Sequence, residues 1–92
     1  MTTRDNLIEL LAKTYPGMLL RTTEEFNGSQ GGIWTSGEDR IKARDRFDLF
    51  NYYSESYNKY EIGVHREIYD LLQENGWYAE WYDAGTIMLW PE

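Results

Sequence analysis

The chain has 92 residues, of which 41% are hydrophobic, 16% aromatic and 27% charged, and its formal net charge is −7. This composition can build one small hydrophobic core, and it excludes disorder along the whole chain. The chain contains no cysteine, which excludes disulfides, a thiolate nucleophile and cysteine-ligated metals and favours a reducing cytosol. We therefore predict a single globular domain over residues 1–92.

The net negative charge comes entirely from the second half of the chain. Residues 1–46 contain seven acids and seven bases, whereas residues 47–92 contain nine acids and only Lys59 and Arg66 as bases. Seven of the eight tyrosines also lie in the second half. Such asymmetry is typical of a protein whose partner has a positive surface, although acidity also serves solubility alone.

The first half predicts a helix followed by a hairpin. Leu7, Leu11 and Tyr15 belong to an apolar stripe at helical spacing over residues 3–14, which Pro16 ends. Residues 17–26 and 33–38 have the character of strands, and the glycine-rich segment 27–32 between them is typical of a turn. Nothing in this half has the pattern of a signal peptide, and no segment of the chain is apolar enough to predict a membrane span.

The middle of the chain is the least clear part. The spacing of Phe47, Phe50 and Tyr53 predicts a short helix near residues 44–53, but an irregular segment pinned by aromatic rings is equally compatible with it. A clearer apolar stripe predicts the next helix over residues 61–75. Gly76 follows at the position of a left-handed helix cap.

The last segment predicts a second hairpin, with strands over residues 77–83 and 86–90 and a turn that ends in Gly85. Alternation places Trp77 and Trp81 on one face of the first strand and Tyr78 and Tyr82 on the other. The predicted fold is α+β, a single small domain with two or three helices packed on a mostly antiparallel sheet of about four strands.

No motif predicts catalysis, a cofactor or a metal. The single histidine, His65, has Glu61 four residues earlier, and the two would be neighbours on a helix. No further ligands stand at a recognisable spacing, so we interpret His65 as structural. The glycine-containing segments do not match a nucleotide-binding fingerprint. We therefore expect a protein that is not an enzyme, with no catalytic, cofactor-binding or metal-binding residues.

One basic cluster favours a second hypothesis. Arg40, Lys42, Arg44 and Arg46 alternate, so on an extended segment they would point the same way and could hold single-stranded nucleic acid beside aromatic rings. Acidic residues interleave with them, however, and the whole protein repels polyanions. Pairing with the molecule's own acids is the favoured interpretation, and direct nucleic-acid binding is the alternative.

The tyrosine-rich second half predicts a binding surface, because clustered tyrosines supply contact area and carboxylates steer a basic partner. The predicted partner-binding residues are Tyr52, Tyr53, Glu55, Tyr57, Tyr60, Glu61, Glu67, Asp70, Glu74, Tyr78 and Tyr82. We expect them to occupy a positively charged, nucleic-acid-binding surface of a host protein. A homodimer is left open as a further alternative.

No family is recognised from these residues. In size, acidity and lack of catalytic motifs the chain is comparable to phage and mobile-element inhibitors, such as small anti-CRISPR proteins and DNA mimics. Immunity proteins that neutralise basic toxins share the same gross features and are the alternative. The likeness is one of composition rather than of motif. It implies a cytoplasmic protein, in the bacterial host if the chain is encoded by a phage.

Overall fold

A computed structural model describes residues 2–54 and 59–92 of the chain. Along these residues the elements run α1 (Arg4–Thr14), β1 (Arg21–Thr22), α2 (Thr23–Asn27), β2 (Ile33–Ser36), β3 (Tyr60–Glu61), β4 (Val64–His65), α3 (Arg66–Glu74), β5 (Trp77–Asp83) and β6 (Thr86–Pro91). The predicted α+β class is confirmed. The described residues fold into one small unit with helices against a sheet.

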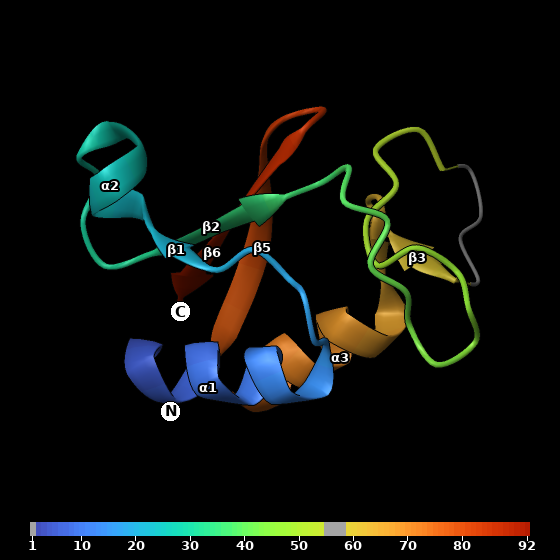
Figure 1. Cartoon of the computed structure of the whole chain (residues 1–92), viewed down its shortest axis with the longest axis horizontal. Coiled ribbons are helices and arrows are strands. Elements are labelled where there is room, and N and C mark those ends of the chain that lie inside the picture. Colours follow the sequence, from blue (N-terminus) through green and yellow to red (C-terminus); the bar gives the residue numbers. More distant parts are fainter. Residues whose placement is uncertain (1, 55–58) are drawn as a thin grey trace.

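The main sheet has four antiparallel strands in the order β1-β2-β6-β5, and β3 and β4 form a separate small hairpin. β6 lies in the interior of the sheet, as its almost uninterrupted apolar sequence indicates. β5 is an outer strand, paired only with β6 among the described residues. Figure 1 shows α1 and α3 beneath the sheet, while α2 stands apart above it, next to β1.

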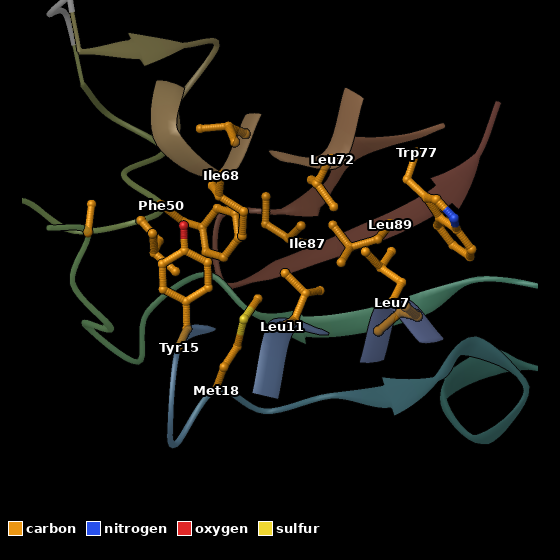
Figure 2. Close-up of a cluster of buried hydrophobic side chains, with 14 residues drawn as sticks. Leu7, Leu11, Tyr15, Met18, Phe50, Ile68, Leu72, Trp77, Ile87 and Leu89 are labelled. Atoms are coloured by element: carbon orange, nitrogen blue, oxygen red, sulfur yellow. The ribbon is translucent and has the colours of Figure 1, made fainter. Parts of the chain in front are cut away.

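The core lies between the sheet and the two long helices (Figure 2). Leu7 and Leu11 of α1 are fully buried, as is Leu89 of β6. Trp77 at the start of β5 is 2% exposed, and its indole nitrogen Nε1 donates to the Thr2 carbonyl at 2.7 Å. Burying each of these side chains stabilises the fold by roughly 1.5–3 kcal/mol relative to leaving it in water.

Both long helices begin and end where local signals place them, with one exception. The Thr3 side chain caps α1, Tyr15 follows its last residue, and Gly17 adopts a φ of 90°. Gly76 after α3 has a φ of 79°, which confirms the predicted left-handed cap. α3, however, starts at Arg66 rather than at residue 61.

Residues 60–65 form a hairpin instead of the first turn of that helix. Its two-residue loop, Ile62 and Gly63, has φ values of 48° and 75°, and two positive values are what a type I′ turn requires. A Cβ on Gly63 would lie 2.8 Å from the Asn51 carbonyl oxygen and 3.1 Å from the Trp81 ring. The helical prediction for 61–65 was therefore wrong, because tertiary contacts around Gly63 outweigh the local periodicity.

The predicted helix near 44–53 is also wrong, and the irregular alternative is correct. Residues 41–49 double back on themselves, since the Leu49 amide donates to the Ile41 carbonyl and the Ala43 amide to the Phe47 carbonyl, both at 2.8 Å. Arg46, inside this loop, has a φ of 72°, which no right-handed helix permits.

The first predicted hairpin is only partly confirmed. β1 has two residues rather than the ten expected for 17–26, and a short helix, α2, takes the place of its second half. Thr22 caps α2, and Gly28 closes it with a φ of 83°. The sequence from Thr22 to Glu25 thus serves as a helix start, because a threonine followed by acids suits a helix N-terminus better than a strand.

Candidate functional site

Six large hydrophobic side chains stand out as exposed among the described residues: Phe47, Tyr52, Tyr53, Ile62, Tyr78 and Tyr82. Four of them are tyrosines predicted to contact a partner, and Tyr53 is the most exposed of these, at 79%. The prediction fails for Tyr60, which is 5% exposed and donates its hydroxyl to the Asp48 carbonyl at 2.7 Å. The predicted contacts Glu55 and Tyr57 lie outside the described residues.

The exposed rings belong to two groups on opposite sides of β5. On the helical side, Tyr52 packs edge-on against Trp81 with ring centroids 5.0 Å apart, and Tyr53 packs on Tyr52. On the other side, Tyr82 packs against Phe26 of α2, also at 5.0 Å. The Tyr82 ring therefore forms part of a small aromatic cluster that α2 covers. The predicted tyrosines do not make one continuous patch.

A groove of about 430 Å³ lies along β5. We call it the edge groove; it is lined by Glu61, Ile62 and Val64 of the β3–β4 hairpin, by Tyr69 and Gln73 of α3, and by residues 78–81 of β5. Alternate residues of a strand point to opposite faces, so four consecutive lining residues mean that the groove wraps the outer edge of β5. Of the predicted contact residues, Glu61 and Tyr78 meet here.

Trp81 fixes the wall of the edge groove. Its Nε1 donates to the Ile62 carbonyl at 2.7 Å, and its ring packs edge-on against Phe50 and Tyr52. Gly63 allows this approach, since a Cβ there would collide with the Asn51 carbonyl oxygen at 2.8 Å and crowd the indole at 3.1 Å. As a result the tip of the β3–β4 hairpin is held against β5, with Ile62 82% exposed at the rim.

Three exposed acids of α3 and β5, Asp70, Glu74 and Glu80, form no ion pair among the described residues. The two bases of the second half are both engaged, Lys59 with Asp45 at 3.3 Å and Arg66 with Glu61 at 2.9 Å. Among the described residues, no cation lies within ion-pair distance of Asp70, Glu74 or Glu80, all of which are exposed; the ion pairs found are Arg4–Glu24, Arg21–Glu25, Lys42–Asp48, Lys59–Asp45, His65–Asp45 and Arg66–Glu61. These carboxylates are therefore unpaired, although Arg44 lines the same hollow as Asp70 and Glu74.

Glu67 differs from the other acids of α3, because the fold uses it internally. One carboxylate oxygen accepts the Tyr15 hydroxyl at 2.7 Å, and the other accepts the Arg44 amide at 3.0 Å. Burial and this hydrogen bond to Glu67 raise the pKa of Tyr15 above its ordinary value. Glu67 thus joins the end of α1 to the loop before β3. Both of its carboxylate oxygens are engaged within the fold, which disfavours a role in partner binding.

The remaining predicted residues line two other hollows. Asp70 and Glu74 line a hollow of about 310 Å³ between α3 and the end of α1. Tyr52 and Tyr53 line one of about 400 Å³, beside Arg40 and Asp48. Seven of the predicted contact residues therefore line three separate hollows rather than one surface: Tyr52, Tyr53, Glu61, Glu67, Asp70, Glu74 and Tyr78.

His65 joins the start of α3 to the 41–49 loop. Its ring is 8% exposed, its Nε2 lies 3.0 and 3.1 Å from the two carboxylate oxygens of Asp45, and its Nδ1 accepts the Glu67 amide at 3.0 Å. The imidazole therefore caps α3 while Nε2 binds Asp45, a partner that the sequence did not indicate. Glu61 is not that partner, because it lies across the hairpin and pairs with Arg66.

Asp45 is the centre of this small network. The Phe47 amide, which donates to it at 3.0 Å, and the contacts with His65 and Lys59 lower the pKa of Asp45 to about 2. Within residues 2–54 and 59–92, no three His, Asp or Glu side chains are grouped so that they could hold a metal ion. The network ties the 41–49 loop to the start of α3.

The basic cluster does not form the alternating strip that the second hypothesis needs. Arg40 and Arg46 have positive φ values of 60° and 72°, so the chain turns at both ends of the cluster. Lys42 pairs with Asp48. This pairing agrees with the interpretation that the bases serve the molecule's own acids, and the extended geometry assumed for nucleic-acid binding is absent.

Sequence reasoning missed Ile62, Tyr69 and Trp81 as members of a surface site. Alternation placed Trp81 on the same face as Trp77, and Trp81 does pack against the core while it also lines the edge groove. One signal could have identified Ile62: the Ile-Gly pair stands inside a predicted helix, where a glycine is costly.

Comparisons of the chain with protein-family models, with curated proteins and with solved structures gave no match. In the part of the chain that the structure describes, none of the helices has the length and apolar character needed to cross a membrane. The function is accordingly inferred from the chain's own geometry.

Proposed function

We propose that this protein is a non-enzymatic binding protein that occupies a positively charged, nucleic-acid-binding surface of another protein. Its composition suits an inhibitor of the phage or mobile-element type that acts in the bacterial cytoplasm. The observation that supports this most is the set of unpaired, exposed carboxylates on α3 and β5, Asp70, Glu74 and Glu80, of which Glu80 lines the edge groove together with the exposed Tyr78.

Unpaired carboxylates favour encounter with a cationic surface. Ion pairs inside a molecule cancel their own field, whereas unpaired exposed acids project it to about a Debye length, roughly 8–10 Å at physiological salt. Such a field raises the association rate with a basic partner and decreases as salt increases. The paired acids of the first half, such as Glu24 with Arg4, contribute much less.

The exposed rings supply the contact area that charge alone does not. Tyr52, Tyr53 and Tyr78 are each at least 40% exposed, and tyrosine is enriched in binding surfaces because its large ring has few rotatable bonds. Rings beside acids suit a partner that presents both arginines and apolar side chains. We therefore expect short-range affinity from the rings and encounter rate from the carboxylates.

The test is capture of basic proteins by the immobilised chain. A bacterial lysate fraction retained on heparin is offered at increasing NaCl, with and without duplex DNA as competitor. The proposal predicts capture that weakens with salt and that DNA displaces. A variant with Asp70→Asn, Glu74→Gln and Glu80→Gln should lose most of this capture.

The control variant removes three charges elsewhere, through Asp5→Asn, Glu9→Gln and Asp39→Asn. These residues are exposed and lie outside α3 and β5, so this variant should retain capture. Equal loss in both variants would show an effect of net charge alone. Absence of capture from this fraction at low salt, or capture that DNA does not displace, would contradict the proposed function.

A further inference from the structure

β5 has an unpaired side, and the pairing register shows which backbone groups lie on it. The Glu92 amide donates to the Gly76 carbonyl at 2.9 Å, so Gly76 and Glu92 form a hydrogen-bonded pair. Hydrogen-bonded pairs recur at every second residue of an antiparallel ladder, and Tyr78↔Trp90 and Glu80↔Met88 are therefore such pairs. The N–H and C=O groups of Ala79 and Trp81 must then point away from β6, toward the edge groove.

These outward groups have no partner in the described fold. The outward N–H and C=O groups of Ala79 and Trp81 form no hydrogen bond with any other described residue. A row of free donors and acceptors on a sheet edge is a template for another strand. These backbone groups border the edge groove, whose volume of about 430 Å³ lies between β5 and the tip of the β3–β4 hairpin.

We propose that the edge groove binds an extended segment of the partner, which adds antiparallel to β5 as a fifth strand and exchanges hydrogen bonds with Ala79 and Trp81. This inference rests on the proposed function and names the form in which the partner is recognised. Strand addition takes its affinity from main-chain hydrogen bonds and its specificity from pockets for alternate side chains.

The side chains around the edge determine the sequence of that segment. A residue opposite Ala79 or Trp81 points to the helical side, between Ile62, Tyr69 and Trp81, where an apolar β-branched side chain fits. Its neighbours point to the other side, next to Tyr78 and Glu80. Opposite charges on neighbouring strands attract, so these positions suit lysine or arginine. The segment is one in which basic and apolar residues alternate.

A second copy of this chain is a poor occupant of the same edge. Glu80 stands in the middle of β5, so full-length antiparallel pairing of β5 with its own copy would set Glu80 against Glu80. Like charges directly opposite each other destabilise a strand pair, and each copy also carries a net charge of −7. The negative charge of Glu80 therefore disfavours self-association at this edge and favours pairing with a basic strand.

Ile62 adds an independent observation at the rim of the groove. It is 82% exposed and has a φ of 48°, a conformation that disfavours a β-branched side chain. Asparagine or glycine would suit this turn position better. An exposed isoleucine held in an unfavourable conformation suits contact with an incoming apolar side chain.

The test uses a seven-residue blocked peptide of alternating lysine and valine, with valine at both ends. One derivative carries N-methyl groups on its two inner valines, whose amides would face β5. A matched derivative carries them on two lysines, whose amides would face solvent. Composition, charge and number of methyl groups are the same, so only the direction of the lost donors differs.

The proposal predicts that N-methylation at valine weakens binding by roughly 10-fold or more, since each lost donor leaves a backbone carbonyl unpaired, and that N-methylation at lysine changes it by less than about 3-fold. Calorimetry at low salt measures the affinity. Amide hydrogen exchange supplies a second readout, in which the Ala79 and Trp81 amides become slower when the unmodified peptide binds.

A variant of this chain tests the same bonds from the other side. Ala79→Pro removes one outward donor without disturbing a bond to β6, and proline is tolerated on edge strands. It should weaken binding of the unmodified peptide by about 10-fold, while the far-ultraviolet circular dichroism spectrum of the protein stays unchanged. If the variant fails to fold, the two N-methyl derivatives still decide the question on the wild-type chain.

The outcomes separate strand addition from the broader function. Equal, salt-dependent binding of all three peptides would overturn strand addition and leave an acidic binding surface. Capture of basic proteins without binding of any peptide would do the same. Stronger loss from lysine N-methylation would overturn the antiparallel arrangement, and a dimer of the free chain that Ala79→Pro dissociates would show that a second copy occupies the edge.

Discussion

The two edges of the sheet are built in opposite ways. β1 is only two residues long, and the chain turns at once into α2, so little backbone is left unpaired there. β5 has seven residues and its outer side opens into the edge groove. Proteins usually shorten or cover sheet edges, because unpaired strands invite association. Of the two edges, the longer one, β5, is therefore the one that a further strand could join.

The means of closure differ as well. At the β1 edge the chain turns away into α2, and the buried Thr23 hydroxyl, which accepts the Gly32 amide at 3.0 Å, holds the start of this turn against the segment that leads into β2. At the β5 edge the restraint is a charge at Glu80 and a register shift between Trp81 and Asp83. Covering an edge excludes every strand, whereas a charge excludes only strands of the same sign.

The largest expected effect is on the β5 side. Trp81→Ala removes the indole that binds the Ile62 carbonyl and packs against Phe50 and Tyr52, and we expect the free energy of unfolding to decrease by about 3 kcal/mol. Urea unfolding measures it. The control Tyr78→Ala, on the same strand but exposed, should cost about 0.5 kcal/mol. Similar losses in the two variants would show that Trp81 does not hold the groove together.

The next effect tests the closed edge. Thr23→Val keeps the shape but leaves the Gly32 amide unpaired, and we expect a loss of about 2 kcal/mol in urea unfolding. The matched control is Thr35→Val, the same change at a side chain that is 1% exposed and for which no hydrogen bond is found among the described residues. It should change stability by less than about 0.5 kcal/mol. Equal effects would mean that the Thr23 hydroxyl does not secure this edge.

A stabilising change is expected at the rim of the open edge. Ile62→Asn replaces a β-branched residue at a φ of 48° with one that tolerates this conformation, and should raise the free energy of unfolding by about 1 kcal/mol. The control Tyr53→Asn, at another exposed side chain with ordinary backbone, should be close to neutral. Ile62→Asn should at the same time weaken binding of the alternating peptide. Lower stability in this variant would show that Ile62 supports the fold rather than a partner.

Some of this fold could be predicted from the sequence, because its signals are local. The apolar stripe with Pro16 and Gly17 defines α1, and alternation from Trp77 to Asp83 defines β5. The exposure of Tyr52, Tyr53, Tyr78 and Tyr82 was also predicted correctly in outline. In each case neighbours in the sequence determine the conformation.

The rest depends on contacts between distant residues. His65 caps α3 through Nδ1 while Asp45, twenty residues earlier, binds Nε2, and the His65 amide donates to the Leu49 carbonyl at 2.7 Å. The same contacts fix the 41–49 loop that periodicity misassigned as a helix. The edge groove could not be predicted either, because β5 becomes an outer strand only when β6 pairs with β2 on its other side.

The smallest expected effect on the free energy of unfolding at neutral pH comes from two carboxylates, Glu24 and Asp45. At the closed edge, the Gly31 amide at 3.0 Å and Arg4 at 2.7 Å hold the pKa of Glu24 at about 2. On the groove side, the Phe47 amide and His65 hold the pKa of Asp45 at about 2. Both pKa values lie below the ordinary 4.5 and 3.8, so both groups contribute stability that is fully present above pH 4.5 and is lost as the pH falls through about 2.

Urea midpoints at pH 7, 4.5, 3 and 2 measure this dependence. Glu24→Gln and Asp45→Asn should each flatten the decline in stability between pH 4.5 and 2, while Glu9→Gln, at an exposed carboxylate without an ion pair among the described residues, should not. An unchanged decline in either variant would contradict the role of that carboxylate. If only Asp45→Asn also weakens peptide binding at neutral pH, the network around Asp45 supports the groove through α3 and the β3–β4 hairpin, whereas Glu24 serves the closed edge alone.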